Sequence, residues 1–199
     1  MKTLILGMGN TLLSDDGIGI ITKRLLEKQL AYSHNIDFCE TSWGGFRIID
    51  LLKGYDYAII VDSIKTNSNL VGYIHHLQPT DLLPSLRLTS YHDINFITAL
   101  KLAEVLNEKV PASIDIYAIE IDDNITICEN ISPSLWSSII RCSEDVLDSL
   151  IKHNIVSPGK KIIPPLNPAE LLNELYIEEY ETDYADTSKN INHLEKILE

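Results

Sequence analysis

The sequence predicts an α/β fold, in which helices cover both faces of a β-sheet. Short apolar runs, typical of buried strands, alternate along the chain with longer segments whose apolar residues recur at helical spacing. The run at 57–61 is apolar at every position, as expected for a strand covered by helices on both faces. With 199 residues, 45% of them hydrophobic, the chain is long and apolar enough for one domain with a sizeable core.

The first half of the chain supplies most of the predicted strands. Residues 3–6 form a short apolar run that stops at the Gly-containing segment 7–10, which indicates a buried strand followed by a turn. A helix follows, because apolar residues recur at helical spacing from Ile18 to Leu26, and Ser14 or Asp15 is placed to be its N-cap. We then expect a strand at 36–40, a helix at 46–52 closed by Gly54, and strands at 57–61 and 71–77.

The second half alternates in the same way. Apolar residues at helical spacing predict a helix over 93–106, and the apolar run at 114–120 predicts another strand. Ser132 and Pro133 are a typical helix start, with Ser at the N-cap and Pro at the first helical position. We expect this last helix to continue to about residue 151.

The character of the chain changes after Pro158. We therefore expect an α/β domain at 1–156, and a Pro-containing linker with a partly helical acidic extension at 157–199. Residues 170–199 hold nine acidic residues against two lysines, a net charge of −7 out of −13 for the chain. A solvated appendage is the simpler interpretation of this extension, and a docking surface for a partner is the alternative.

Composition excludes several classes of partner. A net charge of −13 argues against nucleic acid or an anionic membrane, because both are bound by basic surfaces. No apolar run approaches the roughly 20 residues that span a bilayer, and the apolar start is too short for a signal peptide. The three cysteines form no CxxC pair, which favours reduced thiols in the cytoplasm. We expect a monomer.

Three polar features are expected at the carboxyl ends of strands, where open α/β sheets bind ligands. Asp15 and Asp16 follow the first strand, Asp62 ends the most apolar strand, and His92 stands just before a helix. Two carboxylates and a neutral imidazole would make a three-ligand site for zinc, nickel, manganese or cobalt, with positions open for water or substrate. The alternative is that each is an ordinary capping or surface residue, and for Asp15 a cap is the stronger interpretation.

Other site patterns are incomplete. The motif Gly7-x-Gly9 begins the dinucleotide-binding pattern, but its sixth position is Leu12, where helix–strand packing needs a small residue. Glu40 stands where a ribose-binding acid would, so a dinucleotide-binding enzyme remains an alternative. The sequence has no phosphate loop and no nucleophile elbow. His75 and His76 are adjacent on a predicted strand, so they point to opposite faces and should not share a metal.

Four segments, in order, resemble the hydrogenase maturation proteases, endopeptidases that trim the C-terminal extension of nickel–iron hydrogenase large subunits. Residues 7–19 closely resemble the opening motif of that family. Residues 54–63 are similar to its strand ending in Asp, residues 90–95 to its histidine segment, and residues 116–120 with 131–133 to its last strand and helix start. The resemblance covers about residues 1–151, and the extension after Pro158 lies outside it.

The resemblance implies a three-layer α/β/α sandwich with a twisted, mixed, mostly parallel sheet of about five strands. It also implies that Asp16, Asp62 and His92 bind a metal, and that this metal is the nickel of the precursor. The hydrogenase large-subunit precursor would be the partner, with hydrogenase chaperones as further candidates. We expect water to attack the scissile amide, activated either by the metal or by an Asp carboxylate acting as general base. The alternative from another class is a non-catalytic metal-binding or chaperone module of the same fold.

Overall fold

The computed structural model describes residues 1–31, 33–42, 47–66, 70–82 and 100–164. Three predictions fall outside these residues: the histidine ligand His92, the first part of the helix at 93–106, and the acidic extension beyond residue 164. The chain divides into two compact units, Met1–Ile163 and Pro164–Glu199. The first unit runs past the expected boundary at residue 156, because Ile162 is buried and the Gln29 side-chain amide donates a hydrogen bond to the Ile163 carbonyl (3.4 Å).

Five strands and their connecting helices make up the first unit. The elements are β1 (Thr3–Met8), η1 (Ser14–Gly17), α1 (Ile18–Leu30), β2 (Ile36–Thr41), α2 (Arg47–Leu52), β3 (Tyr57–Ile64), β4 (Ile74–Leu77), α3 (Pro79–Leu82), β5 (Ser113–Glu120), η2 (Pro133–Leu135) and α5 (Trp136–Lys152). Residues 100–105 are also helical. In the described part of the chain, every strand predicted from the sequence is present.

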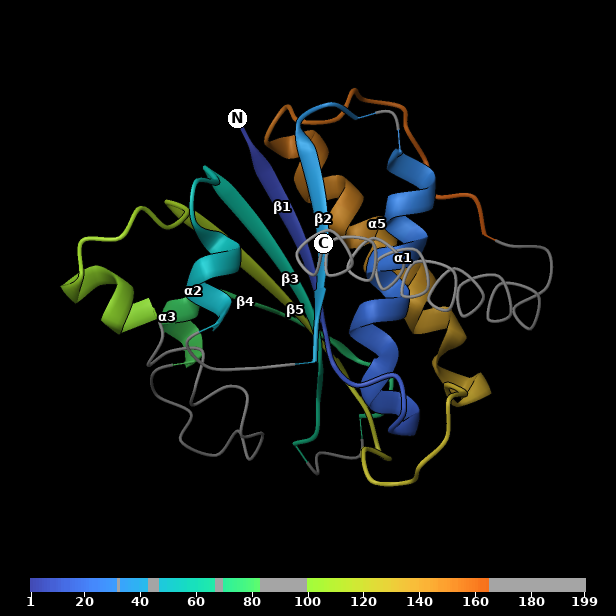
Figure 1. Ribbon diagram of the computed structural model, residues 1–199. Helices are drawn as coiled ribbons and strands as arrows, with labels where there is room; N and C mark the ends of the chain where they lie inside the picture. Colours follow the sequence, from blue (N-terminus) through green and yellow to red (C-terminus); the bar gives the residue numbers. More distant parts are fainter. Residues whose placement is uncertain (32, 43–46, 67–69, 83–99, 165–199) are drawn as a thin grey trace, which may run out of the picture. The chain divides into compact units, whose positions relative to one another are not determined.

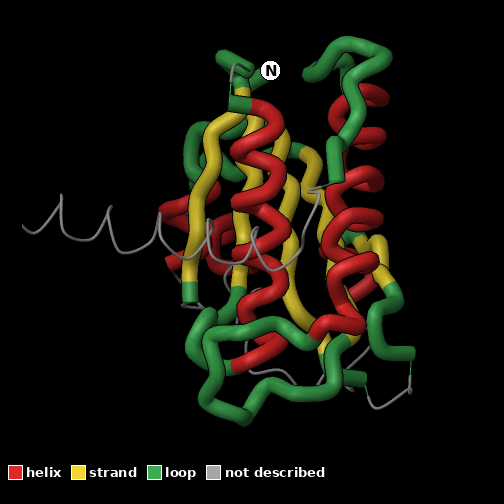
Figure 2. Tube along the Cα trace, turned by 90° about the vertical axis from the view of Figure 1, so that its right-hand side faces the viewer, coloured by secondary structure: helices red, strands yellow, loops and turns green. Residues whose placement is uncertain are grey.

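The sheet has the strand order β2-β1-β3-β5-β4, and only β4 runs antiparallel to its neighbour. Helices α1 and α5 lie against one face of this sheet, and α2 and α3 lie on the other (Figure 1). Seen from the α1–α5 side, two long helices lie in front of the strands (Figure 2). The predicted α/β/α sandwich with a mostly parallel, mixed sheet is therefore confirmed.

Each face of the sheet has its own core, as the alternation of side chains along a strand requires. Tyr117 illustrates the α1–α5 side, where its hydroxyl hydrogen-bonds Ser149 of α5 at 2.6 Å. The main apolar cluster on the α2 side is formed by Leu4, Leu6, Met8, Ile48, Leu52, Ala58, Ile60, Ile114 and Ile116. The central strands are buried on both sides, which explains why β3 is apolar at 57–61.

The strand boundaries differ most from the prediction at β3 and β4. Strand β3 continues through Asp62 to Ile64, because those residues keep their register with β5. Strand β4 begins at Ile74 instead of residue 71, because Gly72 adopts φ 84° and bends the chain before the strand. Asp62 therefore lies within β3, paired with β5, and not in the loop that follows the strand.

Ser132 is the N-cap residue of η2, as predicted, but neither it nor the cap predicted at Ser14 or Asp15 caps a helix through its side chain. Residues Ser14–Gly17 form a 3-10 turn, and α1 begins only at Ile18 without a side-chain cap. The Asp15 carboxylate instead accepts hydrogen bonds from the Ser132 amide (2.7 Å) and hydroxyl (3.0 Å). The Ser132 side chain is bound to Asp15 and makes no capping hydrogen bond to η2, and Pro133 opens that turn as expected. These two predicted caps bind one another across the fold.

Among the described residues, no helix is both long enough and apolar enough to cross a membrane.

Candidate functional site

The segment after β1 is held against the carboxyl edge of the sheet by glycines. A Cβ on Gly9, which has φ 136°, would lie 2.0 Å from the Asp16 carbonyl oxygen. A Cβ on Gly19 would lie 2.3 Å from the Met8 carbonyl oxygen and 2.4 Å from that of Val61. Any side chain at these positions would push the turn and the start of α1 away from the sheet. The glycine spacing therefore fixes Asp16 at the ends of β1 and β3.

Ser63 joins the two predicted acidic ligands. Its hydroxyl donates a hydrogen bond to Asp16 Oδ1 at 2.7 Å, and its backbone amide donates one to Asp62 Oδ1 at 2.8 Å. Asp16 and Asp62 are each half-buried, and Ser63 is buried. Two carboxylates from η1 and β3, far apart in the sequence, thus lie next to one serine at the carboxyl edge.

The loop after β5 pairs with the loop that carries Asp16. The Ser14 amide donates to the Cys128 carbonyl (2.7 Å), and the Cys128 amide donates to the Leu12 carbonyl (3.1 Å). The Asp15 amide donates to the Asp123 carbonyl at 3.1 Å. Figures 1 and 2 both place the loops after β1 and β5 at the same end of the molecule. This pairing holds η1 from the side opposite the sheet.

The third predicted ligand, His92, lies outside the described residues. Within the described part of the chain, no three His, Cys, Asp or Glu side chains gather in a way that could hold a metal. What the described edge offers is two carboxylates, whose oxygen donors suit divalent metals. Sequence analysis identified both, but it missed Ser63, because a serine at a strand end carries no signal of the partner that its hydroxyl will find.

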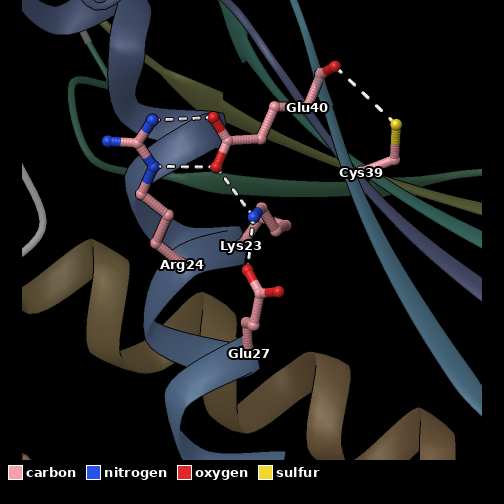
Figure 3. A network of polar contacts seen from close by, with 5 residues as sticks. All are labelled: Lys23, Arg24, Glu27, Cys39 and Glu40. Carbon is pink, nitrogen blue, oxygen red and sulfur yellow. Dashed lines mark hydrogen bonds and ion pairs between the residues drawn. The ribbon is translucent and has the colours of Figure 1, made fainter. Parts of the chain in front are cut away.

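Glu40 has an intramolecular role, unlike that of a ribose-binding acid. Its carboxylate pairs with Arg24 through two hydrogen bonds of 2.7 Å and with Lys23 Nζ at 2.7 Å (Figure 3). Burial acts to raise the pKa of Glu40, but the hydrogen bonds and charges of Arg24 and Lys23 outweigh it and hold that pKa below its ordinary value. A carboxylate bound by two cations has little capacity left for a ribose.

The adjacent histidines of β4 point to opposite faces of the sheet, as predicted. His75 pairs with Glu120 at 3.2 Å, whereas His76 pairs with Asp115 at 3.0 Å and stacks on Tyr117. Burial acts to raise the pKa of Asp115, and hydrogen bonds from Tyr57 and His76 lower it below the ordinary value. Each histidine thus has its own acid, on its own face.

Known proteins match this chain in sequence and in fold. The sequence profile of the family HycI, hydrogenase maturation protease, matches residues 20–152. The chain belongs to the hydrogenase maturation protease family. The predicted family is thereby confirmed over residues 20–152, about two thirds of the 199-residue chain, from α1 to the end of α5.

Individual relatives are distant. The chain is 26% identical over 107 residues to the hydrogenase 2 maturation protease of Escherichia coli, a match that covers 45% of this chain and 65% of that protein. It is 23% identical over 160 residues to the hydrogenase expression/formation protein HupD of Thiocapsa roseopersicina, covering 78% of this chain and 71% of that relative. The chain thus spans just under two thirds of the first of these relatives.

Solved structures support the fold. The hydrogenase maturating endopeptidase HybD of Escherichia coli superposes with a TM-score of 0.64 at 22% identity, covering 82% of this chain and 98% of that one. The maturation protease HybD of Thermococcus kodakarensis gives a TM-score of 0.58 at 22% identity, covering 75% and 99%. At this identity the likeness establishes the common α/β sandwich.

Proposed function

We propose that this protein is an endopeptidase that removes the C-terminal extension from a nickel-loaded hydrogenase large-subunit precursor. Membership of the hydrogenase maturation protease family supports the class of reaction and of substrate. The observation that carries the assignment to a site is the contact of Ser63 with both Asp16 and Asp62. These two carboxylates and the His92 imidazole are the groups that recognise the nickel.

In this proposal the nickel belongs to the substrate. Carboxylate oxygens and a neutral imidazole nitrogen are suitable ligands for nickel, and they complement any ligands that the precursor itself provides. Because Asp16 and Asp62 are only half-buried, a metal ion carried by another protein can reach them without unfolding the edge. A precursor without nickel lacks the group that these carboxylates bind, so the protease discriminates loaded from unloaded substrate.

The hydrolysis needs an activated water and a proton for the leaving amine. The water oxygen attacks the carbonyl carbon of the scissile amide, the C–N bond breaks, and the amine takes up a proton. The proton of the water passes to Asp16 or Asp62 acting as general base, or the substrate's nickel lowers the pKa of that water. Both routes use the same carboxylates, and neither needs a serine or cysteine nucleophile.

The test is to incubate the purified protein with nickel-loaded precursor and with nickel-free precursor, and to follow the precursor's mass. We expect shortening of the loaded precursor only, and no shortening by a His92→Ala variant. Absence of shortening by the wild type would leave the non-catalytic metal-binding module as the function. Equal shortening of the nickel-free precursor would remove nickel recognition from the proposal but keep the peptidase.

A further inference from the structure

At the carboxyl edge of the sheet, the pair formed by His75 and Glu120 lies on the same face as Asp62. In the strand register, Asp62 of β3 lies opposite Ala118 of β5, and Ala118 lies opposite His75 of β4. Residues paired in this way point to the same face of a sheet, so Asp62 and His75 flank the alanine. Two strand spacings separate their Cα atoms, about 10 Å, and Ala118 is the residue of the sheet that lies between them.

Glu120 determines how the His75 ring is oriented. Its carboxylate, with 2% of the side chain exposed, accepts hydrogen bonds from the Thr66 amide and hydroxyl, both at 2.8 Å, and lies 3.2 Å from His75 Nε2. An ionised carboxylate only accepts hydrogen bonds, so Nε2 carries the proton in this pair. The nitrogen left to exchange a proton is Nδ1, which has no hydrogen-bond partner among the described residues.

The ring is also fixed from its other side. Tyr73 packs edge-on against His75, with ring centroids 4.8 Å apart at 78°, and 24% of the His75 side chain remains exposed. A buried carboxylate and an aromatic ring therefore hold the imidazole in one orientation while leaving part of it accessible. A histidine oriented by a buried acid is a common arrangement for proton transfer in hydrolases.

We propose that His75 is a catalytic residue that contacts the substrate peptide beside Asp62 and protonates the leaving amine through Nδ1. This inference rests on the proposed peptidase function. When the scissile C–N bond breaks, the amine nitrogen takes the Nδ1 proton, and the imidazolium becomes a neutral imidazole. The attacking water passes its proton to an edge carboxylate and then to solvent, and the neutral imidazole takes up a proton from solvent before the next cycle. Glu120 is a positioning residue that keeps Nε2 protonated and Nδ1 directed at the substrate.

The chain offers a matched control in the neighbouring histidine. His76 also pairs with a buried acid, Asp115, but on the opposite face of the sheet. His75→Gln keeps a side-chain donor for Glu120 and removes the titratable nitrogen, and His76→Gln makes the same change on the other face. We expect His75→Gln to lower kcat on nickel-loaded precursor about 100-fold with KM changed less than about twofold. We expect His76→Gln to keep the wild-type kcat.

The positioning role is tested in the same assay. We expect Glu120→Gln to lower kcat about 10-fold while KM stays near the wild-type value, because the imidazole is present but less well oriented. A purely structural role would instead lower thermal stability and leave kcat per folded molecule unchanged. A wild-type kcat in His75→Gln overturns the inference and leaves the proposed function standing.

A second measurement separates failure of this inference from failure of the proposed function. In protein labelled with ¹⁵N-histidine, we expect the addition of nickel-loaded precursor to shift the imidazole signals of His75 and to leave those of His76 in place. If the wild type does not shorten the precursor, the peptidase proposal fails, and the signals still decide whether His75 contacts the precursor. Unmoved His75 signals overturn the inference.

Discussion

Two acidic clusters of this fold use their carboxylates in different ways. Glu40 meets the cations of Lys23 and Arg24, whose side chains are only 6% and 8% exposed, so its charge is cancelled inside the protein (Figure 3). Asp16 and Asp62 receive hydrogen bonds from the hydroxyl and the amide of Ser63, which are neutral donors. Hydrogen bonds from neutral donors orient a carboxylate without cancelling its charge. The first cluster thus joins α1 to β2, and the second contains the carboxylates that we propose bind an incoming cation.

The largest expected effect follows from removing charge at the carboxyl edge. We expect Asp16→Asn and Asp62→Asn each to slow cleavage of nickel-loaded precursor about 1,000-fold, equivalent to about 4 kcal/mol, because each loses a charged metal ligand. Their melting temperatures should stay close to that of the wild type, since both side chains are half-exposed. The assay is precursor mass against time, with thermal unfolding measured alongside.

The control for this prediction is Asp37→Asn, a carboxylate on β2 that pairs with Lys2 at the surface. It should cleave at the wild-type rate. If the Asp16 and Asp62 variants also cleave normally, the edge carboxylates are not the groups that recognise the precursor, and the contrast between the two clusters loses its functional meaning.

The next effect is on stability. We expect Glu40→Gln to lower the free energy of unfolding by about 3 kcal/mol, because it leaves buried Arg24 and Lys23 without the carboxylate that they share. Urea denaturation measures this loss. Glu27→Gln is the matched control, because Glu27 also binds Lys23 but is 48% exposed, and its removal should cost less than about 1 kcal/mol. Cleavage by folded Glu40→Gln should be unchanged, and a loss of cleavage would place Glu40 in the site.

Local sequence patterns predicted the fold well. The apolar runs of β1, β3 and β5 reflect burial on both faces, which is a property of each strand by itself. The side-chain partners of Asp15 and Ser132 could not be predicted in the same way, because the hydrogen bonds between them join residues 117 positions apart. A short polar side chain near a helix start has several possible partners, and tertiary structure selects among them.

The candidate site was predictable only where the positions of its residues follow from local patterns. Asp16 and Asp62 were found because parallel strands end at one edge, so a polar residue after each run has a foreseeable location. Glu120 and His75 were not connected, because their contact depends on the antiparallel register of β4 with β5, which the sequence does not specify. The contact of Ser63 with Asp16 was equally hard to predict, because Asp16 lies in a turn far away in the sequence.

A smaller effect concerns pH. The pKa of Glu40 lies below its ordinary value of 4.5, so the ion pairs stabilise the fold above that pH, and the stabilisation is lost as the pH falls through the lowered pKa. We expect the difference in unfolding free energy between the wild type and Glu40→Gln to be constant near neutral pH and to shrink below pH 4.5. Other acidic groups titrate in both proteins, so the difference isolates Glu40. A difference that is as large at pH 3 as at neutral pH would mean that packing, and not charge, is what Glu40 contributes.

The smallest expected effect comes from Ser63. Ser63→Ala removes the hydroxyl that orients Asp16 but keeps the backbone amide that orients Asp62. Water can replace the lost donor at a half-buried carboxylate, so we expect cleavage to slow only about 10-fold, with stability within about 1 kcal/mol of the wild type. Ser63→Thr, which retains the hydroxyl, should recover most of the rate. In the double variant Asp16→Asn with Ser63→Ala, the serine should add little further loss, because the hydroxyl acts through the carboxylate that is already gone. Fully additive losses would show that Ser63 acts on the substrate independently of Asp16, and that the two carboxylates are not organised by a common residue.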